Sequence, residues 1–217
     1  MATHREHERR WPASVAVLAV LGLQLVLPSS IAAGPTWLAP ALELALVLPL
    51  VVTNPVRLDR ENVALRNLAL VLVLALAAVN AVHLARLVVI VTSGRSMDPQ
   101  ELVQAALLIW STNVVTGALA LWEVDRGGPY ARDPRHARPV GRPDLLFPQM
   151  TGVPGWDSRT WLPSFVDYLF VAFTAATAFS PTDTLPLTGR VKLMISALAA
   201  VSLVTVGVVA ARAVNGL

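Results

Sequence analysis

The chain has 217 residues, of which 55% are hydrophobic and only 14% are charged, and its mean hydropathy is +0.60. A soluble domain carries about a quarter charged residues, so the composition excludes one soluble core and indicates a membrane protein. There is no cysteine, which excludes disulfides and cysteine-based metal sites, and the net charge is +3. Because the charges lie in a few hydrophilic segments, they bear on membrane orientation and not on nucleic-acid binding.

Six apolar segments predict an all-α, polytopic membrane helix bundle. About 20 apolar residues cross the hydrocarbon core, and continuous runs of that length satisfy their backbone in lipid only as helices. The basic start followed by the first apolar run also resembles a signal peptide, but the segments that follow favour a first membrane helix. The segments are Ala13–Leu27, Trp37–Thr53, Leu68–Val91, Leu102–Trp122, Phe165–Phe179 and Val191–Val214.

The segments divide the chain into three parts. Residues 1–122 are predicted to form a four-helix membrane domain, residues 123–162 a loop rich in Arg, Pro and Gly, and residues 163–217 a helical hairpin. Basic residues set the orientation of membrane helices. They occur at the N-terminus, after the second segment and in the long loop, whereas the opposite connectors hold only Arg95, and Arg190 with Lys192. This asymmetry predicts six crossings with both termini and the long loop in the cytoplasm.

Polar residues inside the spans are candidate functional residues, because they are costly in lipid unless they are paired or face water. Glu43 and Arg86 share a depth, each on the order of 9 Å from an outer helix end at about 1.5 Å per residue, so an ion pair is predicted. This ion pair would either take part in a relay of ions or protons, or hold the two helices together. Further polar positions are spaced along the third and fourth segments and could form a seam or only interhelical hydrogen bonds; they are Asn80, His83 and Asn113.

The fifth segment carries a second polar pattern. Thr174, Thr177 and Ser180 recur every three residues, and Asp167 shares a broad helical face with the two threonines. This stripe predicts either the lining of a water-filled path between subunits or close helix packing through small residues. Asp183, in the outer turn, would attract cations or cap the sixth segment.

The residues from Asp167 to Arg190 resemble the pore module of tetrameric potassium channels. An aromatic-x-x-aromatic-Thr-Ala-Ala-Thr run precedes an Asp and then Leu-Pro-Leu-Thr-Gly-Arg. Thr177 matches the first filter threonine, Asp183 the closing aspartate, and Pro186 with Thr188 the Pro-x-Thr turn. The resemblance implies an oligomer, a tetramer if channel-like, that conducts monovalent cations through a filter at Thr177, Ala178, Phe179, Ser180, Pro181, Thr182 and Asp183.

The resemblance has one departure and one consequence for topology. No glycine lies between Thr177 and Asp183, whereas the family's filter uses glycine to turn its carbonyl groups toward the ion. A pore helix in that family re-enters from the outer face, which implies a re-entrant fifth segment and an external long loop. The same segment is similar to a family of uncharacterised bacterial inner-membrane proteins, which implies a location in the inner membrane.

Two functions are therefore predicted. The first is an oligomeric pore for potassium ions or protons built from the last two segments, and the second is a non-conducting membrane scaffold or regulator. An enzyme is not expected, because no Ser/His/Asp set, Gly-x-Ser-x-Gly, His-Glu-x-x-His or acidic metal cluster is present. No cofactor, metal or nucleic-acid partner is expected either, and the expected partners are the lipid bilayer and further copies of the chain.

Overall fold

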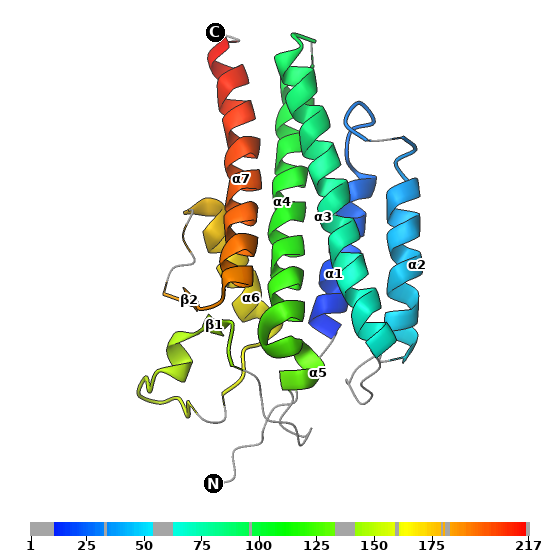
Figure 1. The fold of residues 1–217 in the computed structure, drawn as a ribbon. Coiled ribbons are helices and arrows are strands. Elements are labelled where there is room, and N and C mark those ends of the chain that lie inside the picture. The colour runs from blue at the N-terminus through cyan, green and yellow to red at the C-terminus, as the bar shows by residue number, and fades with distance from the viewer. Residues whose placement is uncertain are drawn as a thin grey trace.

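The computed structural model describes residues 11–32, 34–53, 63–95, 97–132, 142–158, 161–178, 180 and 183–215. Five helices run along an elongated bundle (Figure 1): α1 (Trp11–Leu25), α2 (Leu38–Thr53), α3 (Val63–Thr92), α4 (Pro99–Val124) and α7 (Gly189–Asn215). α6 (Phe165–Thr177) is shorter, and α5 (Pro129–Arg132) is one turn. Short 3₁₀ turns at Asp125–Gly127 and Pro148–Met150 and a two-stranded sheet complete the described elements.

The structure confirms part of the predicted all-α membrane bundle, namely a mostly helical chain with long apolar helices. Three helices of the described chain are long and apolar enough to cross a membrane, over Val63–Thr92, Pro99–Gly127 and Gly189–Val214. The apolar helices α1, α2 and α6 are shorter, with 15, 16 and 13 residues. Many large apolar side chains remain exposed on the outer faces of the bundle, such as Val52, Leu74 and Leu193, as expected where lipid and not water is the solvent.

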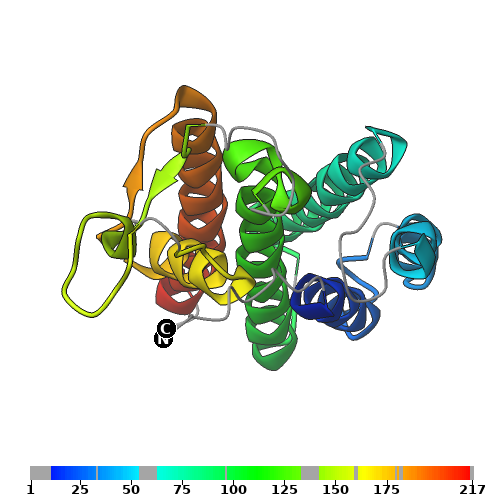
Figure 2. The ribbon, with the colours of Figure 1, turned by 90° about the horizontal axis from the view of Figure 1, so that it is seen from below.

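Helix α4 is the centre of the bundle. Viewed along the bundle, α4 lies between α6 and α7 on one side and α1 to α3 on the other (Figure 2). Asp98 caps its first turn by accepting hydrogen bonds from the backbone N–H groups of Gln100 and Glu101. Gly117 allows α7 to approach closely, because a Cβ there would lie 2.9 Å from Leu198 Cδ1.

The two ends of the bundle differ. We call the end at which α4 terminates and α7 begins the base, and the opposite end, where α3 terminates and α4 begins, the far end. α1 starts at the base, where Ala13 and Val17 share a small cavity with Trp122. α7 starts at the base and ends at the far end, where Val208 and Val209 pack in one cluster with Leu27 and Leu102. The first described residue, Trp11, and the last, Asn215, therefore lie at opposite ends.

The fifth segment enters the bundle and returns to the same end. α6 begins at the base beside Asp125, and the ring of Phe173 packs 5.8 Å from that of Trp110, midway along α4. The chain then comes back to the base, where β2 (Leu185–Pro186) pairs antiparallel with β1 (Leu145–Leu146). In the described fold α3, α4 and α7 therefore run the length of the bundle, α1 and α2 run along part of it, and α6 enters it from the base and returns (Figure 1). The prediction of six crossings with both termini on one side was wrong.

The same return corrects the placement of three charged residues. Asp183, Arg190 and Lys192 were predicted at the opposite end from the long loop. Instead Arg190 pairs with Asp144 of that loop, and Asp183 lies two residues before β2, so all three belong to the base. The error arose because a segment of 13 helical residues spans only about 20 Å at 1.5 Å per residue, too little to cross the hydrocarbon core untilted.

Candidate functional site

The candidate site is the described part of residues 165–184, together with the residues that hold it at the base. We call it the re-entrant segment, because it leaves the base of the bundle and returns to it. Ser164 precedes α6, and the Asp167 carboxylate accepts hydrogen bonds from the Ser164 N–H and hydroxyl, each at 2.7 Å. This arrangement caps the helix and also places a negative charge at the positive end of its dipole. Asp167, predicted to line a path with the threonines, thus marks where the segment begins.

One face of α6 is packed against α4 and α7, and the other is open. Tyr168, Val171, Ala172 and Ala175 are fully buried, and the ring of Phe165 meets that of Trp122 at 6.2 Å. The opposite face exposes three large apolar side chains, those of Val166, Phe170 and Phe173. α6 is therefore held firmly along one side and leaves an apolar strip uncovered on the other.

The end of α6 is polar and exposed. Thr174 is buried, whereas Thr177, Ala178 and Ser180 are exposed, and we call these three residues the tip. The hydroxyl of Thr174 donates to Phe170 O and that of Thr177 to Phe173 O, both at 2.9 Å. The two threonines of the predicted stripe therefore differ in exposure. Of the remaining predicted filter residues, Asp183 is exposed on the returning stretch, and Phe179, Pro181 and Thr182 lie outside the described residues.

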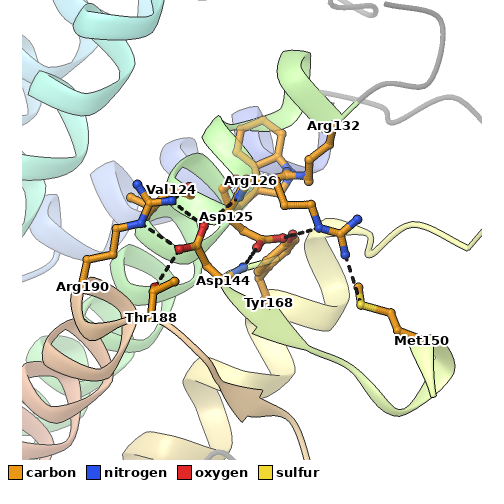
Figure 3. A network of polar contacts seen from close by, with 10 residues as sticks. Val124, Asp125, Arg126, Arg132, Asp144, Met150, Tyr168, Thr188 and Arg190 are labelled. Carbon is orange, nitrogen blue, oxygen red and sulfur yellow. Dashed lines mark hydrogen bonds and ion pairs between the residues drawn. The ribbon is translucent and has the colours of Figure 1, made fainter. Parts of the chain in front are cut away.

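A buried aspartate holds the returning chain at the base (Figure 3). Both oxygens of Asp144 are used: Oδ1 accepts from the Thr188 hydroxyl at 2.7 Å and from Arg190 Nε at 2.8 Å, and Oδ2 accepts from the Arg126 N–H at 2.9 Å and from an Arg190 terminal nitrogen. Its backbone carbonyl also accepts from Leu187 N–H at 2.8 Å. Asp144 thereby joins the end of α4, the long loop and the start of α7.

A second buried aspartate joins α4 to α6. Asp125 Oδ2 accepts from the Tyr168 hydroxyl at 2.7 Å, and its Oδ1 accepts from the Asp144 N–H at 2.9 Å. Arg132, fully buried, donates at 2.7 Å to the carbonyls of both Trp122 and Asp125 and lies over the ring of Tyr168 at 5.2 Å. We call Asp125, Arg132, Asp144, Tyr168, Thr188 and Arg190 the polar clamp.

The electrostatics of the clamp favour charged, fully bonded groups. Burial alone would raise the pKa of Asp144, but hydrogen bonds from Arg190, Thr188 and the Arg126 N–H outweigh it and lower the pKa below its usual value. The described residues contain no group of three or more His, Asp or Glu side chains that could hold a metal ion. With the oxygens of Asp125 and Asp144 occupied by protein donors, the clamp is built to position the re-entrant segment, and no nucleophile or proton acceptor is left open in it.

The backbone that ends α4 explains why the sequence there is Arg-Gly-Gly-Pro. Arg126, Gly127 and Gly128 all have positive φ, at 52°, 88° and 97°. A Cβ on Gly128 would also lie 3.1 Å from the carbonyl oxygen of Glu123. Glycine at 128 is thus required both by conformation and by close approach, and the turn brings Asp125 and Arg132 under α6.

The clamp was not predicted from the sequence, and Asp125, Arg132, Asp144 and Tyr168 were given no role. A usable signal was present: Asp144 stands before an apolar stretch inside a basic loop, a pattern typical of a segment packed under the bundle. The partners of Asp144 could not be identified because they come from Arg190 and Arg126, 46 and 18 residues away.

The predicted ion pair between Glu43 and Arg86 was wrong. Glu43 is buried, and its Oε1 accepts from Gln24 Nε2 of α1 at 3.3 Å. Arg86 is exposed and donates to the carbonyl of Ser30 at 3.3 Å. Equal depth along two helices did not bring the side chains together, because Glu43 faces α1 and Arg86 faces the turn between α1 and α2.

The predicted polar seam is present only in part. Asn113 donates at 2.9 Å to Leu198 O and Ser202 Oγ of α7, so it ties α4 to α7 and not to Asn80. Asn80 and Asn113 nevertheless line one apolar cavity of about 490 Å³ between α3, α4 and α7. Asn80 and His83 are buried, at 3% and 7% exposure.

No protein-family model matches the chain, and neither the curated proteins nor the solved structures include a match.

Proposed function

We propose that the chain is one subunit of a homo-oligomeric, multi-pass membrane protein, and that its re-entrant segment lines a path for small monovalent cations where subunits meet. The three long helices α3, α4 and α7 would cross the bilayer, the shorter α1 and α2 would lie within it, and α6 would enter it from the base and return. The path is proposed at the exposed face and tip of α6, at Thr177, Ser180 and the returning Asp183. Potassium ions and protons are the cations considered.

In this proposal the base faces the cytoplasm. Arginines gather there, including Arg66, Arg126, Arg142 and Arg190 among the described residues, whereas Arg95 and Arg212 are at the far end. Lys and Arg concentrate on the cytoplasmic side of membrane proteins. The re-entrant segment would then enter from the cytoplasmic side, opposite to the pore helix of potassium channels. The proposal therefore concerns a cation path of its own kind and not a potassium filter.

The observation that carries the proposal is a polar helix end exposed at mid-bundle depth. Phe173 packs against the middle of α4, and the tip follows directly after it with Thr177, Ala178 and Ser180 exposed. Irregular backbone at membrane depth is tolerated only where protein covers it or where it lines water. A single subunit provides neither on this side of α6, so a neighbouring subunit and a water-filled path are the physical solution.

The charge at the tip suits cations. The last carbonyls of a helix carry a partial negative charge, and broken helices in transporters use such C-terminal ends to coordinate cations. α6 ends at Thr177, and the N–H of Ala178 donates back to Thr174 O at 2.8 Å, so the C-terminal end of the helix lies at the exposed tip. Asp183 adds an exposed acidic side chain on the returning stretch.

A non-conducting scaffold is the second candidate, and one observation favours it. The hydroxyls of Thr174 and Thr177 both donate to carbonyls of their own helix. The polar clamp also fixes the base of α6 to α4 and α7. In that case the exposed apolar strip of α6 would pack against a neighbouring subunit without an open path.

Flux into liposomes separates the two candidates. Purified protein in potassium-loaded liposomes should release potassium or admit protons, and Thr177→Val and Asp183→Asn should each lower the flux severalfold. Thr205→Val is the matched control, because this buried α7 threonine bonds to Val201 O at 2.7 Å, away from the tip. Wild-type flux no greater than that of empty liposomes would refute the path.

Oligomeric state tests the first half of the proposal separately. Native mass spectrometry from lipid nanodiscs should give a homo-oligomer. Cross-links from a cysteine placed at Phe170 should join two subunits, because this exposed side chain lies on the uncovered strip. The cysteine-free chain supplies a clean background. A monomer that still conducted would contradict the shared path, and an oligomer that did not conduct would favour the scaffold.

A further inference from the structure

Two buried oxygen atoms between α1 and α2 have no hydrogen-bond donor. They are Gln24 Oε1 on α1 and Glu43 Oε2 on α2, and they belong to side chains already joined by the 3.3 Å bond from Gln24 Nε2 to Glu43 Oε1. The two residues are 4% and 2% exposed. Unpaired buried acceptors are uncommon, and each one calls for an explanation.

An ionised Glu43 does not fit these surroundings. Its one protein donor is the neutral amide of Gln24, and the described chain has no Lys or Arg side chain forming an ion pair with it. A buried carboxylate needs charged or multiple hydrogen-bonded partners, and an apolar membrane helix provides none. A metal ion is not indicated either, since the described residues include no group of three metal-ligating side chains.

We propose that Glu43 and Gln24 form a proton-binding site, in which Glu43 is a carboxylic acid that is paired reciprocally with the Gln24 amide. One proton on Glu43 Oε2 turns that acceptor into a donor, and Gln24 Oε1 is the neighbouring acceptor that lacks a donor. The amide already donates in the opposite direction, to Glu43 Oε1. A single proton therefore satisfies both unpaired atoms and removes the buried charge.

A cavity beside Gln24 offers the proton a route toward the turn between α1 and α2. It measures about 220 Å³, lies beside the turn between α1 and α2, and is lined by Gln24, Thr36, Ala78 and His83 among others. A water takes up about 30 Å³, so several waters fit between the turn and Gln24. The site is remote from the re-entrant segment, and it stands whether or not that segment conducts.

The titratable and charged groups around the site are few. On α3, buried His83 lines the cavity, and Arg86, three residues further on, donates to Ser30 O. On α4, Glu101 accepts from the Ser30 hydroxyl at 2.6 Å. The described parts of α1 and α2 carry no charged group other than Glu43. Glu43 does not itself line the cavity, so a proton entering the cavity would reach this buried acid by way of Gln24, with His83 beside the route.

Infrared spectroscopy tests the protonation state directly. The protein in lipid at neutral pH should show the carbonyl stretch of a protonated carboxylic acid, and Glu43→Gln should remove it. Glu43→Gln keeps the size of the side chain and the acceptor for Gln24 Nε2. Labelling wild-type protein with dicyclohexylcarbodiimide, which reacts with protonated carboxyls in apolar surroundings, needs no variant. Mass spectrometry should locate the adduct on Glu43 and not on half-buried Glu101.

The route is tested by exchange of the same proton. In D₂O the acid band should shift as the proton is replaced, and Ala78→Leu, which fills the cavity lining, should slow this shift severalfold. Ala85→Leu is the matched control, on the same helix and exposed. An acid band retained in Glu43→Gln, or no adduct on Glu43 at neutral pH, would overturn the protonated site. Equal exchange in Ala78→Leu and Ala85→Leu would overturn the route through the cavity.

Discussion

The polar clamp at the base and the Gln24–Glu43 pair between α1 and α2 are both buried and polar, yet they are built differently. In the clamp, the oxygens of Asp125 and Asp144 accept from Tyr168, Thr188, Arg190 and backbone N–H groups. In the Gln24–Glu43 pair, one hydrogen bond leaves two oxygens without a donor. The clamp, whose carboxylate oxygens all accept hydrogen bonds, fixes the fold at the base. The Gln24–Glu43 pair, in which two oxygens have no donor, has room for a proton.

The largest expected effect comes from removing the centre of the clamp. Asp144→Ala leaves the Arg126 N–H, the Thr188 hydroxyl and the Arg190 guanidinium without their acceptor. Breaking a buried charge pair from one side costs about 3–5 kcal/mol. The free energy of unfolding in detergent, measured by denaturant titration, should fall by that amount. Arg190→Ala leaves the buried Asp144 carboxylate without its charged partner, so it should also be costly, but less so than Asp144→Ala because the Thr188 hydroxyl and the Arg126 N–H still donate to that carboxylate. A larger loss in Arg190→Ala than in Asp144→Ala would contradict the clamp's dependence on Asp144.

A smaller loss is expected from the second buried charge. Arg132→Leu keeps much of the apolar volume but removes two donors, leaving the carbonyls of Trp122 and Asp125 without these hydrogen bonds. The expected cost is about 2–3 kcal/mol in the free energy of unfolding. Lys192→Leu, an exposed basic residue at the same end, is the control and should change stability by less than about 0.5 kcal/mol. Matching effects of the two substitutions would show that Arg132 does not hold the base.

A pair of glycines compares the clamp with a loop that carries no such network. Gly128 and Gly152 both have positive φ, at 97° and 83°. A Cβ at Gly128 also meets Glu123 O at 3.1 Å, whereas none of the surrounding atoms lies within 4 Å of a Cβ at Gly152. Gly128→Ala should cost about 2 kcal/mol and Gly152→Ala about 1 kcal/mol, because only the backbone strain is common to both. Thermal unfolding of the two variants side by side measures the difference.

The smallest effect is a pH dependence confined to one carboxylate. Asp144 has a pKa below its usual value in the folded protein, so its ionised form stabilises the fold above the unfolded pKa of about 3.9. That contribution is lost as the pH falls through the folded pKa. The stability of wild type over Asp144→Asn should therefore be constant from neutral pH down to about pH 5 and should shrink below about pH 4. If the stability difference between wild type and Asp144→Asn grew as the pH fell, the pKa of Asp144 would be raised by folding and not lowered.

Hydrophobic patterning predicted the helices well. The apolar runs of residues 68–91, 102–122 and 191–214 became α3, α4 and α7. The expected polar positions Asn80, His83 and Asn113 are indeed buried in the bundle. These predictions succeed because they depend only on local composition and on the need for backbone N–H and C=O groups in lipid to be hydrogen-bonded within a helix.

What could not be predicted is the pairing of side chains over long separations. Glu43 was paired with Arg86 on depth alone, but the rotation of α2 about its axis turns it toward Gln24. The fifth segment was predicted to cross because its composition is that of a membrane span. Only the shortness of its helix and the contact between Asp144 and Arg190 show that the chain returns to the base. Rotation and return both follow from packing against other elements, which no local pattern contains.

The central claim is that the re-entrant segment enters the bundle from the base and returns to the base. The chain before this segment and the chain after it should then lie on the same face of the membrane. The cysteine-free chain allows this to be measured with single cysteines at Val153, before α6, and Leu187, after it; both side chains are exposed. A membrane-impermeant maleimide should label both variants in inside-out vesicles and neither in right-side-out vesicles. Labelling of Val153→Cys from one side and Leu187→Cys from the other would show that the fifth segment crosses the membrane and would contradict the account.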